Sequence, residues 1–424
     1  MQTDNQYTGK QLLILGGAVQ CVKVVEAAKE MGVYTIVADQ AENSPAKKLA
    51  DQSIQLSVLD VDGLTEWINH NPVDGVLNYC IDYAQMTHQR LCERFGLACF
   101  GTFEQYRVLN EKRRFKEFCA SCEVDTVPEY SIEDVKQGNV DYPILIKPSD
   151  SSGSRGISIC NCEKDVKNAI DAAVCESKDR QMLIERYMGD CRDFSVTYLM
   201  AKGEAHLIRT GDRFLGDKKD GLDRQAICTM FPSSFSRTYV DKVHPKVKRM
   251  LEKLGIQNGP VFLQGFIDGE TVRFYDPGIR FPGGEYDRIF QKATGIRIVQ
   301  MMVAYALGGS LKECNERLAS SYLLNGKRGI SLCIDAGPGT IAEFDFDRVE
   351  EMDEVIFVAR KAGVGSVIPR SGDVKQRIAE VVLLVDNDLE TIRNKIREVQ
   401  SKIVVRNPLG ESLIVSEMNE ELVT

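Results

Sequence analysis

The polar residues best suited to chemistry lie in one short stretch of the sequence, VFLQGFIDGETVRFYDPGIRFPGG. Gln264 and Asp276 stand twelve residues apart on either side of an Asp-Gly pair, and Arg280 follows four residues later. Apolar and polar residues alternate on both sides of the pair, which predicts a β-hairpin. Asp276 offers a hard anionic oxygen and Gln264 a neutral carbonyl, so this hairpin is a candidate Mg²⁺ site.

The turn of the hairpin decides whether Gln264 and Asp276 share one face. A two-residue turn at Asp268 and Gly269 would place the two side chains on opposite sides of the sheet. A three-residue loop over 268–270 would make them diagonal neighbours on one face. The metal hypothesis therefore predicts the three-residue loop.

A second candidate site is YPILIKPSDSSGSRGISIC, in which a predicted strand reaches Lys147 before a run of serines and glycines. Glycine backbone and serine hydroxyls donate hydrogen bonds to anions, and Lys147 and Arg155 add positive charge. The stretch lacks the GxxxxGK[ST] order of a Walker loop, and a plain hairpin tip remains the alternative. The residues expected to meet an anion are Lys147, Ser151, Ser152, Gly153, Ser154, Arg155 and Gly156.

A third segment, MLIERYMGDCRDFSVTYLM, predicts a strand that reaches Glu185, breaks at Met188 and resumes after Asp193. The backbone groups of such a break can pair with an adenine, while Tyr187 and Met188 pack against the base. Asp193 can accept hydrogen bonds from ribose hydroxyls. Taken singly, the segment also fits an ordinary connection between two strands.

The order of these elements along the chain resembles the ATP-grasp superfamily, in the branch of carbamoyl-phosphate synthase and biotin carboxylase that includes amino-acid ligases. The resemblance rests on Lys112 in NEKRRFK, Lys147 with SSGSRG, the 185–193 segment and the hairpin, and it spans nearly the whole chain. It implies that Lys112 and Lys147 contact ATP phosphates and that the glycine-rich loop closes over the β- and γ-phosphates. It further implies that Glu185 to Met188 hold the adenine, that Asp193 binds the ribose and that Phe266 packs against the base.

The metal ligands of the family are two Glu twelve residues apart and an Asn two beyond, followed by an Arg. This chain has Gln264, Asp276, Gly278 and Arg280 at those positions, so the spacing is kept but only one carboxylate remains. Arg280 is expected to clamp a carboxylate or the acyl phosphate made from it. The implied cofactors are ATP and Mg²⁺ or Mn²⁺.

The elements that must position these residues predict a mixed α/β and α+β fold. Strands and helices alternate to about residue 105, which predicts a parallel sheet in a Rossmann-like preATP-grasp domain over 1–107. We expect an ATP-grasp domain over 108–330, with a lid subdomain at about 125–187, and a small C-terminal α+β domain over 331–424. The late amphipathic pattern of Leu389, Ile392, Ile396 and Val399 predicts a helix.

Two other hypotheses receive less support. Gly16, Gly17 and Asp39 suggest a dinucleotide site, but the GGAVQC run lacks the GxGxxG spacing, so a plain strand-to-helix turn is favoured over an NAD-dependent oxidoreductase. A zinc site lacks its usual motif context. The two close cysteine pairs that could contribute to such a site are Cys119 with Cys122 and Cys160 with Cys162. The four histidines, His70, His88, His206 and His244, are expected to be structural or exposed.

The composition favours small-molecule chemistry. A formal net charge of −9 without a basic block argues against nucleic acid, and no apolar run is long enough to span a membrane. We therefore expect a cytoplasmic protein that acts on small-molecule carboxylate and amine substrates; a homodimer is left open.

The predicted function is an ATP-dependent carboxylate–amine ligase with an acyl-phosphate intermediate. The alternatives are a purine-biosynthesis or carbamoyl-phosphate type of ligase, or an ATP-binding protein with weakened or lost catalysis. Arg209, Asp212 and Arg213 are candidates for the acceptor pocket, although their segment equally fits a charged loop.

Overall fold

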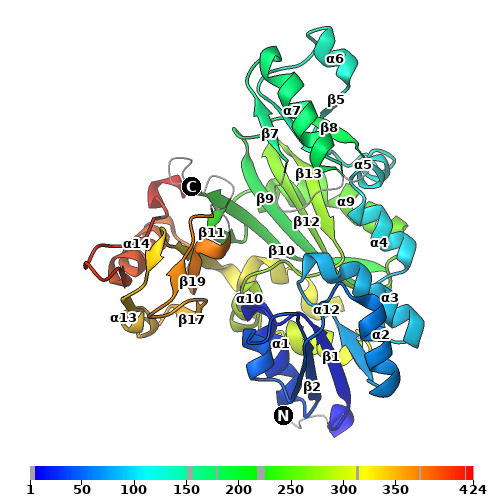
Figure 1. Cartoon of the computed structure of the whole chain (residues 1–424), viewed down its shortest axis with the longest axis vertical. Helices are drawn as coiled ribbons and strands as arrows, with labels where there is room; N and C mark the ends of the chain where they lie inside the picture. The colour runs from blue at the N-terminus through cyan, green and yellow to red at the C-terminus, as the bar shows by residue number, and fades with distance from the viewer. Residues whose placement is uncertain are drawn as a thin grey trace.

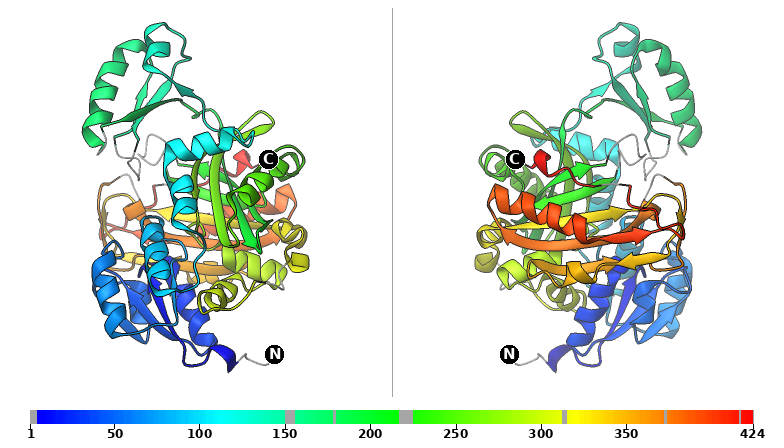
Figure 2. Two further views of the ribbon diagram at one scale, coloured as in Figure 1. Left: turned by 90° about the vertical axis from the view of Figure 1, so that its right-hand side faces the viewer. Right: turned by 90° about the vertical axis from the view of Figure 1, so that its left-hand side faces the viewer.

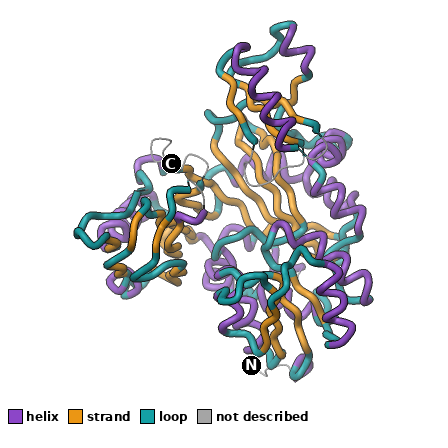
Figure 3. Tube along the Cα trace, viewed as in Figure 1, coloured by secondary structure: helices purple, strands orange, loops and turns teal. Residues whose placement is uncertain are grey.

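The computed structural model of this protein describes residues 5–149, 156–177, 180–216, 225–311, 315–371, 374–415 and 417–423. Within these residues the larger strands form two four-stranded sheets and one eight-stranded sheet. Figures 1 and 3 show the N-terminal sheet at the bottom, the second small sheet at the top and the long sheet between them. No described helix has both the length and the apolar character needed to cross a membrane.

The N-terminal sheet has the order β3-β2-β1-β4, and all of its strands run parallel, as predicted. Both of its faces are buried, which explains the continuous apolar runs in the sequence. A Cβ on Gly75 would meet the backbone of Ala306 at 2.3 Å, so a helix end from late in the chain packs closely on this sheet. The elements are β1 (Gln11–Leu15), α1 (Val19–Glu30), β2 (Tyr34–Ala38), β3 (Gln52–Ile54), α2 (Val61–His70), β4 (Gly75–Leu77), α3 (Gln85–Phe95) and the late helix α11 (Ile298–Ala306).

The second four-stranded sheet belongs to a part of the chain that projects from the body of the molecule (Figure 2), and we refer to this part as the lid. Its order is β5-β8-β6-β7, and its pairs are antiparallel. A small core of its own, including Ile144, Ile146 and Ile184, lies under helix α7. The elements leading to and forming the lid are α4 (Phe103–Asn110), α5 (Lys112–Ala120), β5 (Glu129–Tyr130), α6 (Ile132–Lys136), β6 (Ile144–Pro148), β7 (Ser158–Cys160), α7 (Glu163–Glu176) and β8 (Met182–Arg186).

The long sheet has the order β13-β12-β9-β10-β11-β14-β19-β17. The domain boundary expected at 330/331 falls inside β14, and β17 and β19 extend the same sheet, so the C-terminal segment continues the central sheet where a separate one was expected. Its strands are β9 (Arg192–Ala201), β10 (Glu204–Leu215), β11 (Ala226–Phe231), β12 (Asn258–Asp268), β13 (Thr271–Gly278), β14 (Lys327–Asp335), β17 (Val355–Arg360) and β19 (Arg377–Asp386).

A late helix packs on one end of the long sheet. On β19, the predicted late helix α14 (Leu389–Lys402) buries Ile392, Ile396 and Val399 in the C-terminal core. The remaining helices and strands are α8 (Ser236–Thr238), α9 (His244–Leu254), α10 (Tyr286–Thr294), α12 (Asn315–Leu318), α13 (Asp347–Glu350), β15 (Gly339–Thr340), β16 (Glu343–Asp345), β18 (Val367–Ile368) and β20 (Val404–Arg406).

Alternation along β9 gives the central sheet one apolar and one polar face. Phe194, Val196 and Tyr198 belong to the main apolar core together with α9, while Asp193 and Ser195 point to the other side. The register continues the polar face onto Arg209 and Arg213 of β10 and onto Gln264 of β12. The candidate site is built on this polar face.

Candidate functional site

The hairpin of β12 and β13 differs from the prediction in its turn. Asp268 pairs with Thr271, so the turn has two residues, Gly269 and Glu270, and the predicted three-residue loop is wrong. A β-bulge compensates, because the register shifts between the pairs Gly265–Phe274 and Gln264–Asp276 and leaves Tyr275 as the extra residue. Gln264 and Asp276 therefore lie directly opposite each other, as the metal hypothesis requires.

Asp276 is exposed, and positive charges surround it. Many neighbouring atoms crowd the carboxylate and raise its pKa although it keeps contact with solvent; the charge of Arg280 works in the opposite direction, and so do those of Lys112 and Lys147. Asp82 of the N-terminal domain adds a second negative charge beside it and raises the pKa further. An accessible carboxylate among three cations fits a site for Mg²⁺ and phosphate groups.

Asp193, in contrast, is buried and accepts hydrogen bonds from three side chains of the protein. It is 5% exposed and accepts hydrogen bonds from Arg213 Nη1 at 2.6 Å, Gln264 Nε2 at 3.2 Å and the Tyr275 hydroxyl at 3.4 Å. Burial raises the pKa of Asp193, while Arg213 opposes that shift. Since the amide nitrogen of Gln264 faces Asp193, its carbonyl oxygen is the atom left to ligate a metal.

At the base of the lid, two lysines form ion pairs with one buried carboxylate. Glu185 on β8 is 3% exposed and lies 2.5 Å from Lys147 Nζ and 2.6 Å from Lys116 Nζ. Burial alone would raise the pKa of Glu185, but the two lysines outweigh it and lower the pKa. Lys112, one helical turn before Lys116, donates to the carbonyl of Pro148 at 3.4 Å. Lys116 was not predicted, although its spacing from Lys112 on a charged helix was a usable signal.

Arg280 is held by the N-terminal domain. Its Nε donates to Asp82 Oδ1 at 2.9 Å and its Nη1 to the carbonyl of Phe281 at 3.1 Å. Gln85 supports the pair, because its Nε2 also donates to Asp82 Oδ1, at 2.9 Å. No motif in the sequence pointed to Asp82 or Gln85, since their approach to Arg280 depends on domain packing.

The same packing explains the glycine at position 278. A Cβ built on Gly278 would lie 3.1 Å from Gln85 Oε1, and that oxygen accepts a hydrogen bond from Ile279 N at 2.8 Å. An Asn, which the family has at this position, would require Gln85 to move. Gly278 in place of the family's Asn is therefore matched by Gln85, which lies on helix α3 far away along the chain.

The other predicted nucleotide-binding residues are only partly described. Phe266 stacks on Tyr275 with ring centroids 4.8 Å apart, Met188 is buried and Tyr187 is partly exposed. Gly156 has a positive φ of 68°, which favours glycine. Ser151, Ser152, Gly153, Ser154 and Arg155 lie outside the described residues.

Two other sets of candidate residues, in the GGAVQC turn and on strand β10, include groups that already contact partners within the protein. In the GGAVQC turn, Gly17 N donates to Asp39 at 2.7 Å, and a Cβ on Gly17 would lie 1.9 Å from Ser44 Oγ, so the protein itself fills the space that a pyrophosphate would need. Asp212 lies on the opposite face of the sheet from Arg209 and Arg213 and accepts hydrogen bonds from Ser233 and Ser234.

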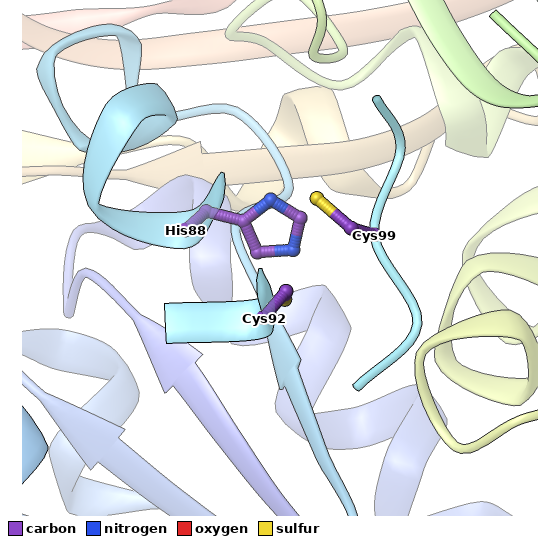
Figure 4. Close-up of side chains that lie close together, drawn as sticks. All are labelled: His88, Cys92 and Cys99. Atoms are coloured by element: carbon purple, nitrogen blue, oxygen red, sulfur yellow. The ribbon is translucent and has the colours of Figure 1, made fainter. Parts of the chain in front are cut away.

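The described residues contain one group of three soft metal-ligand side chains, His88, Cys92 and Cys99, whose ligand atoms lie within 4.8 Å of one another. Figure 4 shows them converging from α3 and the segment after it. His88 contacts the carbonyl of Val76 at 3.1 Å and the Tyr106 hydroxyl at 3.2 Å, and burial lowers the pKa of His88 to about 4. Because Cys99 also donates to a backbone carbonyl, at 3.2 Å, we assign the cluster to the core.

Comparison with known proteins agrees with this geometry. Residues 140–273 match the family model of the ATP-grasp domain. The chain is 25% identical over 273 residues to a formate-dependent phosphoribosylglycinamide formyltransferase of Prochlorococcus marinus, a match that covers 62% of this chain and 68% of that protein.

Two solved structures share the fold along most of the chain. An L-amino acid ligase from Bacillus licheniformis has a TM-score of 0.77 and 18% identity, with 94% of this chain and 99% of that one covered. The biotin carboxylase domain of a Hydrogenobacter thermophilus 2-oxoglutarate carboxylase, solved with MgADP and bicarbonate, has a TM-score of 0.75 and 19% identity, with 94% and 91% covered.

The chain thus carries an ATP-grasp domain and has homologues among the formyltransferase, biotin carboxylase and carbamoyl phosphate synthase families. ATP-grasp enzymes use ATP and Mg²⁺. These relatives support an ATP-dependent ligase that forms carbon–nitrogen bonds.

Proposed function

We propose that this protein joins a small carboxylic acid or amino acid to an amine through an acyl phosphate. The observation that carries the proposal is the exposed carboxylate of Asp276 among Lys112, Lys147 and Arg280 on the polar face of the sheet. Phosphoryl transfer needs mainly positioning and neutralisation of charge, and it requires no nucleophile from the protein.

Different residues of the site contact the phosphates and the acyl group in this proposal. Lys112 and Lys147 neutralise the phosphates, and Glu185 holds Lys147 at 2.5 Å so that its charge stays at the base of the lid. Asp276 and the carbonyl of Gln264 would hold Mg²⁺, which when bound neutralises the phosphate that is transferred. Arg280, oriented by Asp82, clamps the acyl phosphate.

The reaction then follows in two steps. A carboxylate oxygen attacks the γ-phosphorus, the new P–O bond forms and ADP leaves with the electrons of the broken bond. The amine nitrogen attacks the acyl carbon, phosphate leaves, and the ammonium loses its proton to give the amide. Cytoplasmic location and a homodimer stay expectations of this proposal.

An ADP-release screen tests the proposal. The protein is incubated with ATP and Mg²⁺ and with pairs of amino acids, small acids and amines, and released ADP is measured. We expect release that depends on the acid, and trapping of the acyl phosphate by hydroxylamine as a hydroxamate. ATP binding without ADP release for any pair, at high Mg²⁺ or Mn²⁺, would contradict the proposal.

That negative result would favour a second candidate, an ATP-binding protein that no longer turns over. Gln264 and Gly278 in place of the usual ligands are the observation behind it. The two functions predict the same ATP binding and differ only in release of ADP.

A further inference from the structure

Arg209 is a buried cation that the proposed mechanism does not use. It lies on the polar face of β10, paired with Thr197 of β9, and is 5% exposed. Its guanidinium lies 4.7 Å from the ring centroid of Phe231, 5.4 Å from that of Tyr286 and 5.8 Å from that of Phe262. Tyr286 begins helix α10, so Arg209 lies where that helix meets the sheet.

The described residues place no carboxylate within ion-pair distance of Arg209. Its Nη1 donates one long hydrogen bond, 3.5 Å to Thr197 Oγ1, and its Nε has no hydrogen-bond partner. Burial lowers the pKa of Arg209 to about 9. Contacts with aromatic rings stabilise a cation by less than its removal from water costs, so the charge of Arg209 is incompletely compensated.

The neighbouring arginines differ in this respect. Arg213, four residues further along β10, pairs with Asp193 at 2.6 Å, and Arg280 pairs with Asp82 at 2.9 Å. Beside Arg209 the polar face offers a further free donor, because the buried Ser195 Oγ, opposite Gly211, also has no hydrogen-bond partner. Two unsatisfied groups on one face are suited to an anion with oxygen acceptors.

Arg209 and Arg280 both lie close to the aromatic ring of Phe262. The guanidinium of Arg280 lies 5.4 Å from the ring centroid of Phe262, and that of Arg209 lies 5.8 Å from the same centroid. A small molecule whose reacting carboxylate lies at Arg280 can therefore extend a second group toward Arg209.

We propose that Arg209 binds a carboxylate of the substrate that is not phosphorylated. This inference rests on the proposed function and narrows its substrate class to small molecules with a second carboxylate besides the reacting one, such as an acidic α-amino acid or another dicarboxylic acid. A bidentate contact from the guanidinium, with Ser195 Oγ as a further donor, would compensate the buried charge.

The test compares Arg209→Met with Arg209→Lys. For the best acid found in the ADP-release screen, we expect Arg209→Met to raise KM at least thirtyfold, Arg209→Lys to raise it less, and KM for ATP to stay within a factor of two. The matched probe is the same substrate with its second carboxylate converted to a primary amide, whose KM should be high in the wild type and unchanged in Arg209→Met. The control is Arg107→Met, at a partly exposed arginine of helix α4 that the proposed mechanism does not use.

Equal changes in KM for acid and amide, or no change for either, would overturn the inference while leaving the ligase function intact. If the wild-type protein releases no ADP with any pair, the ligase function fails separately. The shift in melting temperature produced by succinate, L-glutamate and succinamide then decides about Arg209. Stabilisation by the two acids but not by succinamide, lost in Arg209→Met, supports the inference, and any other pattern contradicts it.

Discussion

Two charged clusters in this protein resemble each other in composition and differ in accessibility. Around Lys23, which is 5% exposed, Asp287 lies at 2.7 Å and Glu285 at 3.6 Å, and Glu285 is also 3.0 Å from Arg288. Burial opposes the charge of Lys23, but Asp287 and Glu285 outweigh it and raise the pKa of Lys23. Around Asp276, the same types of charge leave an exposed carboxylate.

The difference in accessibility indicates that the Lys23 cluster stabilises the fold, whereas the Asp276 cluster is suited to binding a ligand. The Lys23 cluster joins helix α1 to the start of α10, and its carboxylates form ion pairs with Lys23 and Arg288. The Asp276 cluster keeps its carboxylate accessible. Buried charges that are already paired hold domains in place, whereas accessible charges with unused capacity can serve a ligand.

Removing Lys23 tests the structural half of the comparison and should have the largest effect. Lys23→Met leaves Asp287 buried without its cation, so we expect a loss of about 3 to 5 kcal/mol in the free energy of unfolding, measured with denaturant. Lys29→Met breaks an exposed ion pair with Asp51 and should cost about 1 kcal/mol or less. Similar losses in the two variants would contradict the comparison.

Removing the charge of Asp276 tests the chemical half. We expect Asp276→Asn to lower the rate of ADP release by roughly a hundredfold to a thousandfold, because a ligand of the metal and phosphate site is lost. The melting temperature should hold, since this exposed carboxylate lies in surroundings that already raise its pKa. Unchanged turnover in Asp276→Asn would refute the metal assignment.

Buried His88, like the Lys23 cluster, is expected to affect stability, and its effect should depend on pH. Its pKa of about 4 in the folded protein lies below the ordinary value of 6.5, so the unfolded chain takes up a proton first as the pH falls. Stability should fall by roughly 3 kcal/mol between about pH 6.5 and pH 4. Unfolding measured across this range should show a clearly weaker dependence in His88→Gln; an identical dependence would exclude His88 as its source.

The smallest effect on activity is expected at Asp82, which only orients Arg280. Asp82→Asn keeps a hydrogen-bond acceptor for Arg280 but removes the charge, so we expect kcat to fall by about tenfold while KM for ATP changes little. Steady-state kinetics check this. A large rise in KM for ATP would instead place Asp82 in the nucleotide site.

Much of the local structure followed from the sequence, because it depends on short-range patterns. The parallel N-terminal strands, Lys147 within strand β6 and the hairpin itself were predicted from alternation and turn residues. The bulge at Tyr275 was missed, since a register shift depends on pairing with neighbouring strands. The link between the C-terminal segment and the central sheet was missed for the same reason.

The sequence by itself determined which side chains this protein has for phosphate and metal and the order of the elements that carry them. Only the tertiary structure decided which of them remain accessible. Asp193 is buried and accepts hydrogen bonds from Arg213 and Gln264, Asp276 stays exposed, and Asp82 reaches Arg280 from a distant part of the chain. The physical reason is that capacity for a ligand depends on how many partners the fold brings to each charge, and those partners lie far away along the chain.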